Sequence, residues 1–209
     1  NSRRAICTLF EKVNPRRKAP AAFELLTAVY AAEPVRVDGQ KTSYFDLRED
    51  WVGDATAKPP LEGRAARLRA TGQKGNVLHD VASTDFLQVC LLMYSQRQRQ
   101  AAALAGKTGK DLPPVTARND DLLDLPRAAY LEHADKVQKG FVEAAQFLNG
   151  ERILFARDVP YPPQLVALAA VFADQDKTLP AGAQKRLRRW YWAVALSESY
   201  SASTETKLA

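Results

Sequence analysis

Apolar residues recur along most of this chain with the three- and four-residue spacing that places them on one face of an α-helix. The pattern is strongest before Asn149 and Gly150, two residue types that commonly end helices. The apolar face of that segment consists of Tyr130, Ala134, Val137, Phe141, Ala145 and Leu148. We therefore predict a mainly α fold, a multi-helix orthogonal bundle with at most a minor hairpin or short strand.

The same spacing predicts further helices earlier in the chain. Residues 23–30 form a candidate helix that ends before Pro34, and residues 83–85 are good capping residues for a longer helix. A short helix is expected near Trp51, followed by a stretch rich in Arg, Gly and Ala that we expect to pack loosely. In the longer helix, the expected inward positions are Phe86, Val89, Leu92 and Met93.

The last two predicted helices have different patterns. Residues 165–172 are apolar nearly all round, which predicts a central buried helix. The next helix is expected to cover the core and to expose a basic surface, with Trp192 and Tyr200 free to bind. Its apolar face consists of Leu187, Trp190, Tyr191 and Val194, and its basic face of Lys185, Arg186, Arg188 and Arg189.

Two short segments leave alternatives open. Asp38-Gly39 separates an alternating Val35-Arg36-Val37 from residues 41–45, which fits either a small hairpin or a loop. Residues 152–156 are a short apolar piece that could form a strand or begin a loop.

The two ends of the chain suggest a larger polypeptide. A helical stripe begins at Ile6 with no Met or turn before it, and residues 203–209 resemble a helix that has just begun. We expect two units. Residues 1–32 would form two helices around a basic turn, and residues 33–209 a helical domain.

Composition indicates a globular protein with a basic surface. With 209 residues, of which 46% are hydrophobic, the chain can bury a core. No apolar run approaches the roughly 20 residues that cross a bilayer, so we expect no membrane partner and a cytoplasmic location. The formal charge of +6 permits a polyanionic partner without identifying it.

Histidine and cysteine usage argues against a metal site or a catalytic nucleophile in this chain. His79 and His133 lack ligand partners at metal-binding spacing, so we expect surface or capping roles for both. Cys7 and Cys90 are expected to be buried free thiols. Residues 106–108, Gly-Lys-Thr, resemble the end of a phosphate-binding loop, but Ala101 stands where that motif needs Gly, which favours a plain loop.

Two basic segments are the candidate binding sites. The turn containing Asn14, Arg16, Arg17 and Lys18 could hold the phosphate of a cofactor by charge-assisted hydrogen bonds. The basic face of the last helix, together with Tyr200, could bind nucleic acid. Each segment also has a plainer interpretation, a helix connector for the first and a solvated helix face for the second.

Two separated segments resemble one known family. Residues 10–14, Phe-Glu-Lys-Val-Asn, followed by residues 22–26, Ala-Phe-Glu-Leu-Leu, are similar to a signature of GmrSD-type modification-dependent restriction endonucleases. Residues 190–192 and 197–205, with their Trp-rich and Ser-Glu-Ser-Tyr-Ser sequences, resemble a segment near the end of the same domain. Tyr161-Pro162 and residues 45–48 also fit, and the matches occur in the family's order.

The resemblance implies the helical portion of a bacterial restriction or anti-phage defence protein. Residues 1–32 would then be the tail of a ParB-like nucleotide-binding region, with Asn14 and residues 16–18 near its bound nucleotide. The implied partners are DNA, a preceding nucleotide-binding core and a following nuclease domain. The parent protein would be an NTP-dependent endonuclease, whereas this portion would hold neither a cofactor nor a complete catalytic site. The alternative hypothesis is a helical protein-interaction scaffold with no nucleic-acid role.

Overall fold

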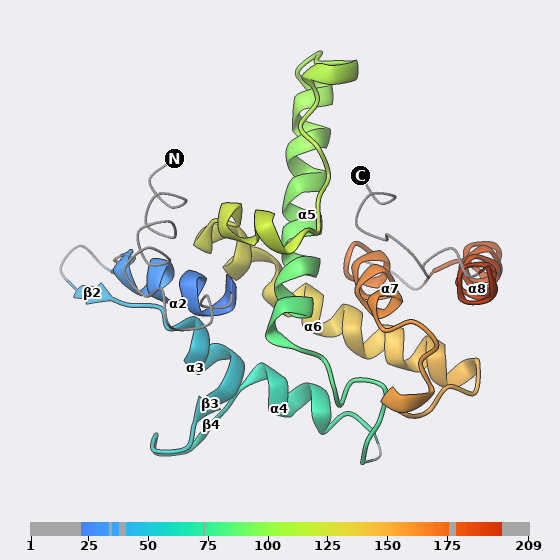
Figure 1. Ribbon diagram of the computed structural model, residues 1–209. Coiled ribbons are helices and arrows are strands. Elements are labelled where there is room, and N and C mark those ends of the chain that lie inside the picture. The colour runs from blue at the N-terminus through green and yellow to red at the C-terminus, as the bar shows by residue number, and fades with distance from the viewer. Residues whose placement is uncertain (1–21, 34, 38–40, 73, 176–178, 198–209) are drawn as a thin grey trace, which may run out of the picture.

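The computed structural model describes residues 22–33, 35–37, 41–72, 74–175 and 179–197. Within these ranges the prediction of a mainly α fold is confirmed (Figure 1). The predictions for residues 1–21 and 198–209 lie outside the described residues. The α-helices are α2 (Ala22–Ala32), α3 (Leu47–Val52), α4 (Arg64–Arg69), α5 (Ser83–Leu104), α6 (Arg127–Gly150), α7 (Pro163–Ala173) and α8 (Ala181–Leu196).

Helices α5, α6 and α7 pack on one another and form the centre of the fold. Figure 1 shows α5 standing steeply across α6, with α7 beside both and α2, α3 and α4 on the opposite side from α8. The rings of Phe86 in α5 and Phe141 in α6 stack with centroids 6.0 Å apart. Trp51 of α3 and Tyr130 of α6 also pack against Phe86. Aromatic contacts therefore join α3, α5 and α6.

The predicted apolar face of α6 is confirmed, since all six of its residues are buried. Pro126 is the N-cap of α6, and the helix ends at Gly150. A Pro without an N–H fits a helix start because the first N–H groups have no partner within the helix.

Helices α6 and α7 come very close at Gly140. A Cβ atom built there would lie 2.4 Å from the carbonyl oxygen of Ala169 and 2.8 Å from the Cβ of Ala173. The small residues of α7 thus allow backbone-to-backbone contact. Helix α7 is largely buried as predicted, although Val171 is 38% exposed, so its apolar surface is not covered all round.

The prediction of loose packing after Trp51 is wrong. Residues 64–69 form α4, in which Arg64, Ala65 and Leu68 are buried. The sequence offers a single large apolar residue in this helix, and the other anchor is a buried cation whose partners come from distant segments. A hydrophobic pattern cannot reveal such an anchor.

The strands are short. Residues 35–37 and 41–43 form an antiparallel hairpin, β1 (Val35–Val37) with β2 (Lys41–Ser43), which decides between the two alternatives for that segment. A second pair, β3 (Gly53–Asp54) with β4 (Leu61–Glu62), was not predicted. Residues 152–156 lie in a loop that makes one isolated bridge, between Asn76 and Phe155, and leads into the 3₁₀ turn η3 (Ala156–Asp158).

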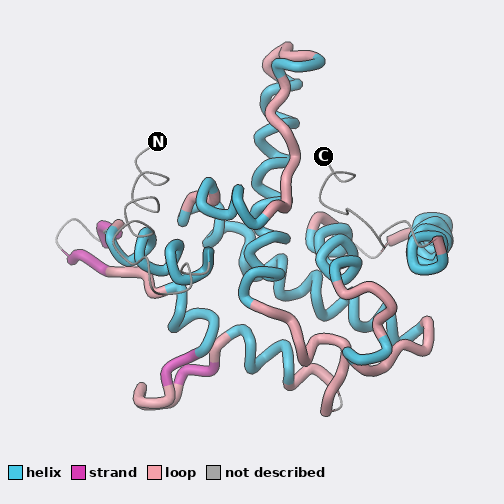
Figure 2. The backbone as a smooth tube through the Cα atoms, in the orientation of Figure 1, coloured by secondary structure: helices cyan, strands magenta, loops and turns pink. Residues whose placement is uncertain are grey.

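Helix α5 begins in the core and then leaves it. Phe86, Val89 and Met93 are buried as predicted, while Leu92 is only partly buried. The C-terminal half of α5 extends away from the body, and the chain returns along it through the 3₁₀ turn η1 (Gly109–Asp111) before a second such turn, η2 (Asn119–Asp124) (Figures 1 and 2). We call residues 95–116 the arm.

The contact at Gly140 gives a direct test of the helix packing. Gly140→Ala is expected to lower the free energy of unfolding by about 2 kcal/mol, because the added methyl group forces α6 and α7 apart. Chemical denaturation followed by circular dichroism measures the change. Gly150→Ala is the control, since nothing lies within 4 Å of a Cβ at that position. Equal stability of the two variants would contradict the close approach.

Candidate nucleic-acid interface

The residues predicted from sequence to bind ligands divide into two groups. Asn14, Arg16, Arg17, Lys18 and Tyr200 lie outside the described residues. Lys185, Arg186, Arg188 and Arg189 all lie on α8, which the structure describes in full. The candidate interface within the described residues is therefore the surface of α8.

Tyr191 anchors α8 to the body. Its side chain is completely buried, and its ring meets that of Phe147 in α6 edge-on with centroids 6.1 Å apart. The side-chain amide of Gln164 in α7 donates to the backbone carbonyl of Tyr191 at 3.2 Å. Burial, with the nearby charge of Glu151, raises the pKa of Tyr191 to about 12. The phenol therefore stays neutral and serves as an apolar anchor.

Glu151 makes a second connection between α8 and the body. Arg188 donates to one carboxylate oxygen of Glu151, and the indole N–H of Trp192 donates to the other at 2.9 Å. The Glu151 side chain is 9% exposed. It follows the last residue of α6, where the negative end of the helix dipole disfavours an acidic residue. An acidic residue at such a position signals a cationic partner, and here that partner is Arg188.

Three other cations of α8 take no part in this attachment. Lys185, Arg186 and Arg189 are exposed and have no ion-pair or hydrogen-bond partner in the described part of the chain. Trp190 is 37% exposed and lies one helical turn after Arg186. We call Lys185, Arg186, Arg189 and Trp190 the outer face of α8. No acidic residue occurs between Ala181 and Leu196, so nothing within the helix neutralises this charge.

The structure corrects the expected roles of the two tryptophans. Trp190 was expected in the core but is exposed, and Trp192 was expected to be free but is partly buried against Glu151. Leu187 and Val194 lie on the Trp190 side of Tyr191 around the helix, so periodicity favours Trp190 as the inward ring. The hydrogen bond to Glu151 selects Trp192 as the inward ring. The basic surface therefore has an aromatic neighbour, Trp190, which was not the one predicted.

A buried charge cluster is the other concentration of polar groups. Arg64 donates to Asp50 at 2.7 Å and to Asp135 at 2.8 Å, and its guanidinium lies 5.8 Å from the ring centroid of Phe86. Tyr130 donates its hydroxyl to the same Asp50 oxygen. Although burial opposes the charge, bonding to Asp50 raises the pKa of Arg64. Burial and Asp50 raise the pKa of Tyr130, so neither group is a base near neutral pH.

Three other reactive side chains lie in the part of the chain that the structure describes. Cys90 is a buried free thiol as predicted, and burial raises its pKa, which disfavours the nucleophilic thiolate. His133 was expected at the surface or as a cap but is buried in α6, and its Nδ1 has no partner among the described residues. His79 is half exposed and lies beside Asp80. Residues 106–108 follow a helix rather than a strand, as expected for a plain loop.

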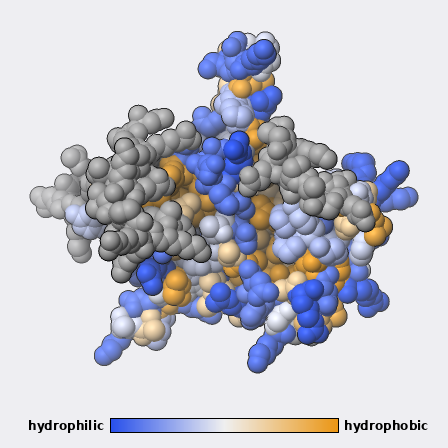
Figure 3. Space-filling model, viewed as in Figure 1, coloured by the Kyte–Doolittle hydropathy of each residue, from blue (hydrophilic) through white to orange (hydrophobic). Residues whose placement is uncertain are grey.

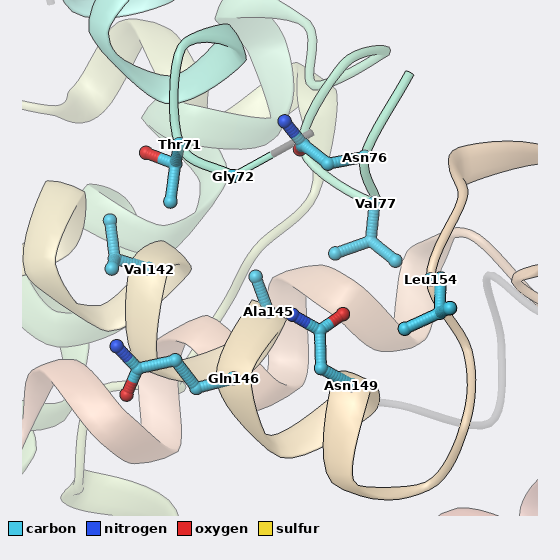
Figure 4. Close-up of a pocket in the computed structure, with 9 residues that line it drawn as sticks. All are labelled: Thr71, Gly72, Asn76, Val77, Val142, Ala145, Gln146, Asn149 and Leu154. Carbon is cyan, nitrogen blue, oxygen red and sulfur yellow. The ribbon is translucent and has the colours of Figure 1, made fainter. Parts of the chain in front are cut away.

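One surface pocket of about 280 Å³ lies between the loop after α4 and the C-terminal half of α6 (Figure 4). Its polar lining side chains are Thr71, Asn76, Gln146 and Asn149. Asn76 already uses its amide within the fold, donating to the Arg69 carbonyl and accepting from the Leu78 N–H. None of the lining residues is titratable, so this pocket supplies no acid or base.

Comparison with protein-family models, curated proteins and solved structures finds no match to this chain. None of the helices in the described ranges combines the length and apolar character needed to cross a bilayer. Within those ranges, no three His, Cys, Asp or Glu residues are grouped to hold a metal ion. The outer face of α8 is thus the predicted binding site that lies within the described residues.

Replacing Arg64 tests the buried cluster. Arg64→Ala is expected to lower the free energy of unfolding by about 3 kcal/mol, because Asp50 is left without its cation. Arg67→Ala, an exposed change in the same helix, is the control and should cost less than about 0.5 kcal/mol. In denaturant titrations, the Asp50→Asn/Arg64→Ala double variant should lose less stability than the sum of its single changes. Additive losses would disprove the coupling.

His133 predicts a pH dependence of stability. Burial, and then the charge of Arg97, lower its pKa, with smaller effects from Glu132, Lys136 and Asp174. The unfolded chain then binds the proton more readily, so stability should fall as the pH drops below about 6.5. The free energy of unfolding should therefore be smaller at about pH 5.5 than at about pH 7.5.

Urea midpoints at the two pH values measure this effect. His133→Gln should remove that part of the loss, whereas His79→Gln, a change at an exposed ring, should keep it. The assignment fails if the two variants follow the same pH profile.

Proposed function

We propose that this chain is the helical portion of a GmrSD-type restriction or anti-phage defence protein and that the outer face of α8 contacts DNA. The observation that carries the DNA contact is a set of three exposed cations without partners in the described chain, on a helix with no acidic residue. In the same proposal, Asn14 and residues 16–18 lie near the nucleotide-binding core of the full-length protein. The family assignment rests on the sequence resemblance alone.

The geometry of α8 supports a phosphate-binding role. Arg186 and Arg189 are close enough along the helix to reach neighbouring phosphates, and guanidinium groups bind phosphate oxygens by paired hydrogen bonds. Trp190, beside Arg186, offers a ring face for a sugar or an unpaired base. Arg188 has a different role, because its bond to Glu151 holds α8 in the orientation that exposes the other cations.

A protein-docking role is the second candidate. Leu196 is 76% exposed on the same helix as Trp190, and exposed apolar side chains favour a protein partner over a phosphate backbone. Salt separates the two candidates: phosphate contacts release counterions from DNA and therefore weaken as the salt concentration rises, whereas apolar docking does not.

DNA binding should depend on the outer-face cations. The Lys185→Ala/Arg186→Ala/Arg189→Ala variant should bind a fluorescent duplex at least tenfold more weakly than the unchanged chain at about 100 mM salt. Across a salt series, the slope of log affinity against log salt should fall by about 0.9 for each cation that neutralises a phosphate. Fluorescence anisotropy measures both quantities.

The control is Lys58→Ala/Lys74→Ala, which removes exposed cations from loops remote from α8 in sequence. It should leave the salt slope nearly unchanged, and circular dichroism should show that every variant is folded. Failure of the unchanged chain to bind duplex DNA, or equal binding by the outer-face variant, would overturn the proposed DNA contact.

A further inference from the structure

The arm extends from the body of the protein, and the described residues of the arm that lie farther out than Arg97 make no hydrogen bond to the body. Among the described residues, the hydrogen bonds of residues 99–113 stay within the arm. The last bond to the body along α5 is the ion pair of Arg97 with Glu132 of α6. Figure 1 shows the far end of α5 standing clear of the other helices. The distal arm therefore adds nothing to the hydrophobic core.

The arm is nevertheless well braced. At its base, the hydroxyl of Ser95 accepts from the Thr116 N–H at 3.1 Å, and farther out Arg99 donates to the Pro113 carbonyl at 3.0 Å. At its end, Gly106 takes a positive φ of 85° and its N–H bonds to the Ala103 carbonyl, which closes the helix. These bonds hold the end of the arm in a defined position, so it differs from a loose surface loop.

The end of the arm combines cations with one exposed apolar side chain. Lys107 and Lys110 are exposed and without partners in the described chain, and Leu104 is 91% exposed. The arm carries four cations and one acidic residue, Asp111. In Figure 3 the far end of the arm is largely hydrophilic. Lysines beyond a helix C-terminus interact favourably with its dipole, but that does not account for the exposure of Leu104.

We infer that the end of the arm is a second contact with duplex DNA, with Lys107 and Lys110 on phosphates and Leu104 against the sugars and base edges between them. This inference rests on the proposed function, because it assumes the same ligand as the outer face of α8. Charge complementarity selects a polyanion as the occupant. An apolar side chain that shares the end of the arm with cations suits a groove, where leucine can pack on sugars and bases while the cations hold the backbone.

The two kinds of contact have different signatures. The Lys107→Ala/Lys110→Ala variant should lower the salt slope by about 1.8 and weaken binding about tenfold at about 100 mM salt. Leu104→Gln should weaken binding about threefold with the salt slope unchanged, because it removes no charge. Lys58→Ala/Lys74→Ala is the charge-matched control, and Figure 1 places its loops at the end of the molecule opposite the arm.

Anisotropy with the same labelled duplex, read beside the α8 variant, distinguishes the outcomes. Binding by the Lys107→Ala/Lys110→Ala variant with the affinity and slope of the unchanged chain, while the α8 variant binds weakly, would overturn the arm contact alone. Weakening by the arm changes with no effect of the α8 changes would support the arm and overturn the outer face of α8. No binding by the unchanged chain would overturn both DNA contacts. Both would also be overturned if the arm and α8 variants lost no more DNA affinity than the control variant.

Discussion

The arrangement of the helices depends on the burial of one positive charge. The Arg64 guanidinium is almost inaccessible to water, and a buried cation is costly unless carboxylates compensate it. Asp50 of α3, whose side chain is 21% exposed, and Asp135 of α6, whose side chain is 91% exposed, both pair with it, so the ion pairs join α4 to two helices. Phe86 of α5 lies under the same guanidinium. A short helix with little apolar surface thereby fixes the relative positions of three neighbours.

The exposed cations show the opposite arrangement. Arg64 is neutralised inside the protein, whereas Arg186, Arg189, Lys107 and Lys110 have no partners in the described chain and lie on α8 and the arm. Neither element adds much to the central packing of α5, α6 and α7, since α8 is anchored mainly by Tyr191 and the distal arm by its own hydrogen bonds. The surfaces most suited to binding a polyanion are therefore carried by elements outside the central packing of α5, α6 and α7.

Sequence periodicity predicts the parts of this fold in which apolar side chains determine the structure. The inward face of α6 is predicted correctly because Tyr130 to Leu148 keep one period over many turns. Helix α4 is missed because its anchor is an ion pair with residues 14 and 71 positions away. The β3–β4 pair is too short to produce an alternating pattern. Pattern alone detects the hydrophobic contacts of this chain and not its long-range polar ones.

The candidate site illustrates the same limit at the level of single residues. Four cations on α8 appear equivalent in the sequence, yet Arg188 is bound by Glu151 and the other three are not. Because Glu151 also receives the Trp192 N–H, one carboxylate determines both which cation is neutralised and which indole faces inward. The bond from Gln164 and the partly buried Leu187 also hold α8 on the body, and the two bonds to Glu151 add a restraint on its rotation about Tyr191. Glu151, at the C-terminal end of α6, thus helps to leave Arg186 and Trp190 exposed on the same side of α8.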